Sequence, residues 1–383
     1  MVNMIKKLKE KIFSHDGLVQ ISISHILGSA ITSIFWFYLA SIMEPEEYGE
    51  IFFLIGIAAM AFNFSNIGSE NTQVVLSAKG RKLEPTLNTI SLIIGVVSSL
   101  IMIIIFSEIN ITILIFGYII NTLSLGYLIG VKLYRQYSIF LLTQKILTVT
   151  LGISFFYYFG VDGVIPALGI SYLGFIIIIV KLYRKDSINF KEFKRNFNFI
   201  WQNYLLKIVG GVRDNLDKLI IVPILGFTFL GNYALAAQFI AVLSLPNLIF
   251  FQYILTNDAV KIKNKKLKKY FLLVNVGIVI LAITLLPVVI REVFPQFSEI
   301  TEIIGIMSIS LIFSTIVSIK ISELLADEKS KPVLIGGIIS GIVVSLGIII
   351  LGSLYGIYGV AISFVLTTAV HAIFLSLWVR KNN

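Results

Sequence analysis

The sequence predicts an all-α integral membrane protein with about twelve transmembrane helices and little chain outside the bilayer. First, 57% of its 383 residues are hydrophobic and only 14% are charged, whereas soluble domains carry about 25% charged residues. Second, long apolar runs recur from one end of the chain to the other. Third, lysines and arginines concentrate in alternate connections between these runs. A soluble chain this apolar would lack the polar side chains to cover its surface, so the solvent that the sequence fits is lipid.

Twelve apolar runs are each long enough to cross a hydrocarbon core about 30 Å thick, which takes about 20 helical residues. The run that begins at Leu18 is longer than the roughly 7–15 apolar residues of a cleaved signal peptide, which predicts a retained helix. The runs at 48–69, 200–226 and 298–320 carry the most polar residues. The twelve runs are 18–43, 48–69, 86–107, 109–131, 137–159, 161–182, 200–226, 229–256, 270–290, 298–320, 332–353 and 356–379.

The basic residues predict the orientation, because cytoplasmic connections are enriched in lysine and arginine. With the N-terminus in the cytoplasm, 25 of the 31 basic residues fall on the cytoplasmic side and only Arg291 falls outside. Omitting one helix would invert every later connection and destroy this asymmetry. The distribution therefore supports twelve helices with both termini cytoplasmic. The other five basic residues fall inside the runs: Lys145, Lys207, Arg213, Lys218 and Lys320.

The net charge of +10 is thus explained by membrane topology, and no nucleic acid is expected as a partner. The densest cytoplasmic clusters are Lys6–Lys11, Lys181–Arg195 and Lys261–Lys269, and the last of these could also contact anionic lipid headgroups. The chain has no cysteine and only three widely separated histidines, His15, His25 and His371, so neither a metal centre nor a cofactor is expected.

A weak internal repeat divides the twelve runs into two sets of six. Glu47-Tyr48-Gly49 follows the first run much as Leu230-Gly231-Asn232-Tyr233 follows the seventh. Gly160-Val161-Asp162-Gly163-Val164 precedes the sixth run as Gly356-Ile357-Tyr358-Gly359-Val360 precedes the twelfth. Six helices in each half give both halves the same orientation, a parallel repeat of the kind found in transporters. The expected organisation is a bundle at 1–182, a basic cytoplasmic connector at 183–199 and a second bundle at 200–383.

Three stretches resemble the polysaccharide-export and O-antigen flippase branch of the multidrug/oligosaccharidyl-lipid/polysaccharide exporter superfamily. They are Phe37-Tyr38-Leu39-Ala40 with Pro45-Glu46-Glu47-Tyr48-Gly49, then Asp214-Asn215-Leu216-Asp217-Lys218-Leu219-Ile220-Ile221, and Leu230-Gly231-Asn232-Tyr233-Ala234-Leu235-Ala236. The motifs are short, and the resemblance extends over the whole chain in helix number and loop pattern.

This resemblance implies two six-helix bundles, as in the MATE fold, around a central cavity that opens alternately to each side. It implies a flippase, and no enzyme, that moves an isoprenoid-diphosphate-linked oligosaccharide across the cytoplasmic membrane of a bacterium or archaeon for surface polysaccharide or lipopolysaccharide assembly. The implied partners are the lipid-linked substrate, membrane lipids, glycosyltransferases and a polymerase or ligase. In several members of the family, cationic residues line the cavity and meet the diphosphate.

The charged residues inside the predicted helices are the candidate site, because charges at such depth usually face a bundle interior or water. The cavity candidates are Arg213, helped by Lys207 and Lys218, and Lys145; an arginine can bind phosphate through two parallel hydrogen bonds. Alternatively, Arg213 with Asp217, and Asp214 with Lys218, form ion pairs at i, i+4 spacing. Lys145 alternatively extends its amine to the cytoplasmic interface.

The acids Glu70, Asp214 and Asp217 are candidates for a gate or an ion-coupling site, although packing or a position at the interface explains Glu70 more simply. Lys320 and Glu323 are expected to pair at the interface, and His25 and His371 to be buried and hydrogen-bonded. A sodium or proton site built from these acids would favour a cation-coupled exporter of small molecules on the same fold. A membrane-embedded polymerase or ligase is the other alternative, but every outside connection is short and no catalytic motif is present.

Overall fold

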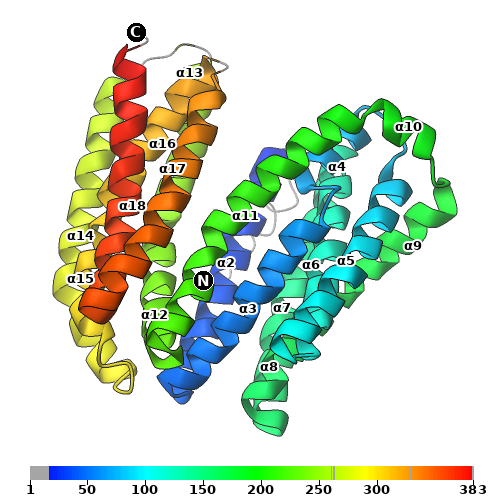
Figure 1. The fold of residues 1–383 in the computed structure, drawn as a ribbon. Coiled ribbons are helices and arrows are strands. Elements are labelled where there is room, and N and C mark those ends of the chain that lie inside the picture. Colours follow the sequence, from blue (N-terminus) through cyan, green and yellow to red (C-terminus); the bar gives the residue numbers. More distant parts are fainter. Residues whose placement is uncertain (1–16, 260, 262–263, 328, 382–383) are drawn as a thin grey trace, which may run out of the picture. The chain divides into compact units, whose positions relative to one another are not determined.

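The computed structural model describes residues 17–259, 261, 264–327 and 329–381, which are helical almost throughout and contain no strand (Figure 1). The predicted cluster Lys6–Lys11, together with His15 and Lys263, lies outside these described residues. The helices in chain order are α2 (Gly17–Ile42), α3 (Pro45–Ser65), α4 (Glu70–Ala78), α5 (Glu84–Phe106), α6 (Asn110–Gly130), α7 (Tyr134–Phe159), α8 (Val164–Ser171), α9 (Ile176–Lys185), α10 (Phe190–Arg195), α11 (Phe197–Leu225), α12 (Phe227–Leu243), α13 (Leu245–Ala259), α14 (Lys265–Val293), α15 (Ile300–Ser308), α16 (Ser310–Ala326), α17 (Lys331–Gly347) and α18 (Ser353–Lys381).

Within the described ranges, eight continuous helical segments are long and apolar enough to cross a membrane, and the bent pair α12–α13 makes a ninth. Two of the eight, Tyr134–Lys185 and Lys331–Lys381, are 52 and 51 residues long. A straight helix of about 50 residues would extend about 75 Å, more than twice the hydrocarbon thickness. Each of the two therefore makes two crossings, and with the more polar α11 the number of crossings is the predicted twelve.

The two long segments reverse direction at the glycine motifs that the repeat singles out. Gly160 and Gly356 adopt φ values of +69° and +57°, a left-handed backbone that glycine reaches without steric cost. Three residues later, a Cβ on Gly163 would lie 2.5 Å from the carbonyl oxygen of Phe155, and a Cβ on Gly359 would overlap the carbonyl oxygen of Leu351. The same glycines thus perform the same two tasks in both halves: one turns the chain, and the other lets the returning helix touch the preceding one.

The second predicted run differs from expectation at its inner end. It is predicted as one helix over 48–69, but α3 ends at Ser65 and a short helix, α4, begins at Glu70. Ser69 caps α4, because its hydroxyl accepts a hydrogen bond from the backbone N–H of Thr72. The break places Glu70 at a helix N-terminus, where the helix dipole favours a negative charge.

The chain packs as two compact units. Unit 1 holds the described residues up to Phe35 together with Leu54–Gly211, and unit 2 holds Trp36–Phe53 together with the chain from Val212 onward. The division passes through α2, α3 and α11. The packing units therefore differ from the predicted repeat, 1–182 and 200–383, at two places. Residues 36–53 pack in unit 2 and the start of α11 packs in unit 1. The six-plus-six division into domains remains a prediction from the repeat.

The core of unit 2 contains residues of the sequence motifs. In unit 2, Tyr48 is fully buried and lies edge-on to Phe297, with ring centroids 5.6 Å apart. The start of α3 crosses α12 there with backbone against backbone: a Cβ on Gly49 would overlap the carbonyl oxygen of Phe227, and a Cβ on Gly231 would overlap that of Pro45. Gly49 and Gly231 are the glycines of the matching turns in the two halves, so this contact explains why both are glycine.

Candidate functional site

The charged residues of α11 form a different set of ion pairs from the predicted i, i+4 pairs. Arg213 pairs with Asp214, its Nη2 lying 2.8 Å from Oδ1. Lys218 pairs with Asp217, its Nζ lying 3.3 Å from Oδ1. The prediction of Arg213 with Asp217 and Asp214 with Lys218 was therefore wrong. The cause lies on α12, where the hydroxyl of Tyr233 donates a 2.7 Å hydrogen bond to Oδ2 of Asp217 and holds that carboxylate away from Arg213.

Asp217 and Lys218 are largely buried and satisfy each other. Their side chains are 15% and 18% exposed, and Lys218 Nζ also donates to the backbone carbonyl of Asp214 at 3.1 Å. With Tyr233 on the second oxygen, the Asp217 carboxylate has three hydrogen bonds, one of them from its neighbour's backbone N–H. This cluster has the features of a structural support that fixes α11 against α12 inside unit 2.

Arg213 lies in a more open setting. Its side chain is 37% exposed and that of its partner Asp214 is 59% exposed. The guanidinium lies against the glycines of α17, since a Cβ on Gly337 would be 3.6 Å from Nη1 and a Cβ on Gly341 would be 3.7 Å from the Arg213 stem. Within the described part of the chain, Nη1 has no partner, so Arg213 retains hydrogen-bonding capacity that Lys218 has used.

In unit 1, Lys207 lies on the same helix, α11, but has no carboxylate within ion-pair distance among the described residues. Its Nζ lies 5.3 Å from the centroid of the Phe62 ring, over the face of an aromatic side chain that attracts a cation. Glu70 is close enough to interact with it electrostatically. The side chain of Glu70 is exposed, at the start of α4.

Lys145, on α7, likewise has no carboxylate within ion-pair distance in the described ranges. Its stem packs on α2, where a Cβ on Gly28 would lie 3.4 Å from Lys145 Cγ. Its charge interacts with His25, one turn earlier on α2. His25 is hydrogen-bonded as predicted, with Nε2 2.6 Å from the Tyr137 hydroxyl, but its side chain is exposed.

The Lys320–Glu323 pair and His371 lie in unit 2. Lys320 and Glu323 pair at 2.9 Å, as predicted. His371 is buried, but its Nε2 has no hydrogen-bond partner among the residues described. No group of three or more potential ligands in the described chain is arranged to hold a metal ion.

Sequence reasoning missed the partners that come from distant helices. Phe62 beneath Lys207, Tyr137 beside His25 and Tyr233 on Asp217 carry no signal in the sequence, because the pattern within one helix does not tell which aromatic side chain of another helix packs against it. Sequence reasoning also missed a cluster of buried polar side chains around the α3–α4 break. The side-chain amides of Asn66, Gln73 and Asn88 are fully buried and have no partner among the described residues.

The solved structures that resemble this chain are membrane transporters. An inward-facing multidrug resistance MATE family transporter of the MOP superfamily matches with a TM-score of 0.72 and 15% identity, over 96% of this chain and 98% of that one. The lipid II flippase MurJ, in an inward closed conformation, matches with a TM-score of 0.70 and 16% identity, over 94% of this chain and 87% of that one.

A third match is a MOP superfamily transporter from Pyrococcus furiosus, whose binding pocket is described as having reverse polarity, suggesting a different function. It has a TM-score of 0.67 and 17% identity, over 96% of this chain and 95% of that one. No family model matches the sequence, and no curated protein matches it. At these identities the likeness establishes the fold: the chain is an all-α membrane protein with the architecture of the MATE and MurJ transporters.

Proposed function

We propose that this protein is a flippase that moves an isoprenoid-diphosphate-linked oligosaccharide across the cytoplasmic membrane by alternating access. Its fold is shared by a flippase for a lipid-linked substrate and by multidrug transporters. The fold alone leaves the substrate class open, so the charges of the candidate site have to favour one class. The substrate of this proposal carries a diphosphate, which needs cations with unused hydrogen-bonding capacity.

The observation that carries the proposal is the pairing state of the membrane charges. Lys145 and Lys207 have no carboxylate within ion-pair distance among the described residues, and Arg213 has only the exposed Asp214. Of the three candidate acids, Asp214 and Asp217 are already engaged by Arg213 and Lys218. Unpaired positive charge in an apolar setting is stabilised by binding an anion. Of the three candidate acids only Glu70 has no ion pair in the described chain, which leaves little negative charge for a cationic substrate.

In the proposed mechanism, Lys145 and Lys207 of unit 1 bind the diphosphate while the isoprenoid chain stays in the bilayer, and Arg213 of unit 2 is a separate candidate contact for it. Arg213 offers a planar donor group for phosphate oxygens, and the lysines act as point charges. Glycosyltransferases on the cytoplasmic side and a polymerase or ligase on the far side complete the assembly that this proposal implies. Export of small cationic molecules, with Glu70 as the coupling acid, is the competing function.

The test is reconstitution of the purified protein in liposomes. A fluorescent isoprenoid-diphosphate oligosaccharide is followed by its protection from a membrane-impermeant quencher, and efflux of a cationic dye under a sodium or proton gradient is measured in parallel. The proposal predicts translocation of the lipid-linked sugar and no gradient-driven dye efflux. Dye efflux without sugar translocation would move the protein to the small-molecule exporters.

A further inference from the structure

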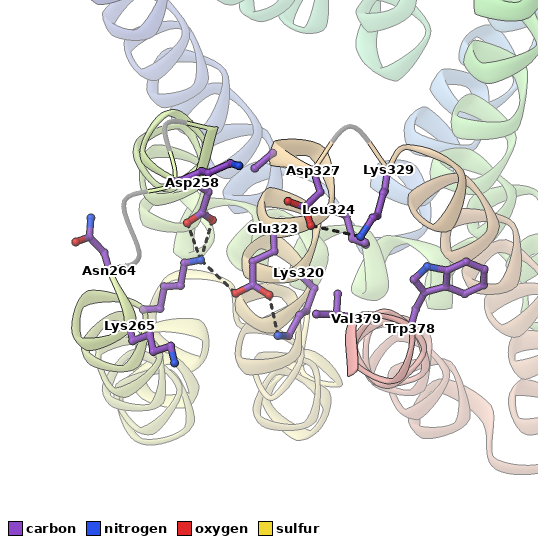
Figure 2. A pocket seen from close by; sticks show the side chains of 13 residues that line it. Asp258, Asn264, Lys265, Lys320, Glu323, Leu324, Asp327, Lys329, Trp378 and Val379 are labelled. Atoms are coloured by element: carbon purple, nitrogen blue, oxygen red, sulfur yellow. Dashed lines mark hydrogen bonds and ion pairs between the residues drawn. The ribbon is translucent and has the colours of Figure 1, made fainter. Parts of the chain in front are cut away.

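Unit 2 contains a cavity of about 690 Å³ at the ends of four helices (Figure 2). It is lined by the end of α13, the start of α14, the end of α16 and the end of α18. The predicted topology places all four of these ends at the cytoplasmic surface of the membrane. The volume is in the range of small-molecule sites, which are about 300–1,000 Å³. The lining includes Asp258, Lys261, Lys265, Lys268, Glu323 and Trp378.

One part of the lining is a neutral network of ion pairs. Lys268 Nζ lies 2.7 Å from Asp258 Oδ2 and 3.2 Å from Glu323 Oε1, and Lys320 Nζ lies 2.9 Å from Glu323 Oε2. Figure 2 shows these contacts as a continuous chain of dashed lines from Asp258 through Glu323 to Lys320. Asp258 and Lys268 are 8% and 13% exposed, so this part of the lining is largely buried and charge-balanced.

Lys261 and Lys265 line the same cavity but take no part in the network. Both side chains are exposed, and neither has an ion-pair partner among the residues that the structure describes. The remaining lining pair, Lys329 with Asp327 at 3.5 Å, is neutral. The cavity therefore carries two uncompensated positive charges beside a charge-balanced wall.

The start of α14 has the wrong charge for an isolated helix. Its first two turns contain Lys265, Lys266, Lys268 and Lys269, with no acid in the first turn and no side-chain cap from Asn264. A helix N-terminus carries partial positive charge and unpaired N–H groups, so cations there are unfavourable and an anion is favourable. A bound phosphate would satisfy the helix end and the lysines together.

The surroundings of the cavity are those of the membrane interface. Trp378 lines the cavity, and tryptophan is enriched where headgroups meet acyl chains. Large apolar side chains on the same two helices are exposed close by: Tyr270 and Leu273 on α14, and Leu377 on α18, are 65%, 59% and 60% exposed. An anion that enters here is therefore expected to carry an apolar body along these helices.

From these observations we infer that the cavity is a binding site for the phosphate headgroup of an anionic phospholipid of the cytoplasmic leaflet. Lys261 and Lys265 bind the phosphate, the network of Lys268, Asp258 and Glu323 shapes the wall, and the acyl chains lie along α14 and α18. Basic pockets between transmembrane helices bind anionic headgroups in this way. The site is independent of the proposed substrate and goes beyond the proposed function, so its test contains no transport measurement.

Trp378 provides a local reporter, because it is one of three tryptophans. In a full-length Trp36→Phe/Trp201→Phe variant, its fluorescence is measured in vesicles that contain phosphatidylglycerol with brominated acyl chains, and then phosphatidylcholine brominated in the same way. We expect brominated phosphatidylglycerol to quench Trp378 more strongly than brominated phosphatidylcholine does. Each lysine should raise the affinity for phosphatidylglycerol over phosphatidylcholine about fivefold. Adding Lys261→Gln/Lys265→Gln should remove most of this preference, because no unpaired charge then remains in the cavity lining.

The matched control is Lys191→Gln/Lys194→Gln on α10, which removes the same charge from a predicted cytoplasmic segment of unit 1 and should leave the preference intact. Equal quenching by both lipids in the starting variant would overturn the inference, as would a preference that survives Lys261→Gln/Lys265→Gln or is lost in the control. Thermal stability of the unmodified chain provides a second measurement: phosphatidylglycerol should raise its Tm and the double variant should lose that increase. If millimolar glycerol phosphate alone gives the same increase, the ligand is a soluble phosphate and the lipid site is wrong.

Discussion

Lys145 and Lys207 differ from the other candidate residues in having no carboxylate within ion-pair distance in the described chain. Each is held by apolar or small groups instead: Gly28 packs on the Lys145 stem, and the Phe62 ring lies beneath the Lys207 amine. A charged amine in such a setting is costly, and residues of this kind usually have a function. We therefore propose that these two lysines contact the substrate and that Lys218 has a structural role.

Arg213 is predicted to act on substrate without supporting the fold. Its ion pair with Asp214 is more than a third exposed on both sides, and such pairs contribute about 0–1 kcal/mol to stability. Arg213→Gln should therefore leave membrane levels and Tm near wild type and reduce translocation about tenfold, the effect of losing one charge-assisted hydrogen bond. Asp214→Asn is the matched control and should keep translocation. A fall in membrane level for Arg213→Gln alone would return Arg213 to a structural role.

Asp217 is predicted to act in the opposite way. Asp217→Asn removes the counter-ion of the largely buried Lys218 and weakens the hydrogen bond from Tyr233, so it should lower the free energy of unfolding by about 2 kcal/mol. Tyr233→Phe removes only one hydrogen bond and should cost about 1 kcal/mol. Thermal unfolding in detergent measures both. An unchanged Tm together with abolished transport in Asp217→Asn would identify Asp217 as a coupling site instead.

At the scale of elements, the crossing of α3 and α12 depends on two glycines at matching positions of the repeat. Gly231→Val should destabilise unit 2 by about 3 kcal/mol, because any Cβ there would overlap the backbone carbonyl of Pro45 and backbone has little freedom to move aside. Gly277→Val on α14, where nothing lies within 4 Å of the added Cβ, is the control. Comparable Tm values for the two variants would show that the helices do not meet at these glycines.

Much of the fold was predictable because each membrane crossing needs a long apolar run and each tight reversal needs a glycine. The run at 161–182 and the turn at Gly160 illustrate this. The α3–α4 break was missed because Asn66–Ser69 interrupts an apolar run without a proline, and a nine-residue helix such as α4 is too short to show in such a pattern. The ion pairs of α11 were mispredicted because Tyr233, on the next helix, decides which acid faces which cation.

At the scale of the whole molecule, the positive-inside distribution predicts which connections face the cytoplasm. The chain has no cysteine, so single cysteines report accessibility without background. Ser298→Cys and Ser330→Cys are both at exposed positions, at the start of the α15 segment and before α17. In intact cells a membrane-impermeant maleimide should label the first and not the second. Labelling of Ser330→Cys from outside would invert the topology and place the cavity of unit 2 on the wrong side for the inner leaflet.

We propose that unpaired lysines of the membrane helices carry a lipid diphosphate across the bilayer. The most direct measurement compares wild-type protein with Lys145→Gln/Lys207→Gln in liposomes that contain a labelled isoprenoid-diphosphate oligosaccharide, with Lys181→Gln, an exposed lysine of α9, as the control. We predict rapid translocation by wild type and by the control, and a loss of tenfold or more, on the order of one charge-assisted hydrogen bond, in the double variant at unchanged Tm. Translocation by the folded double variant at the wild-type rate would contradict the claim.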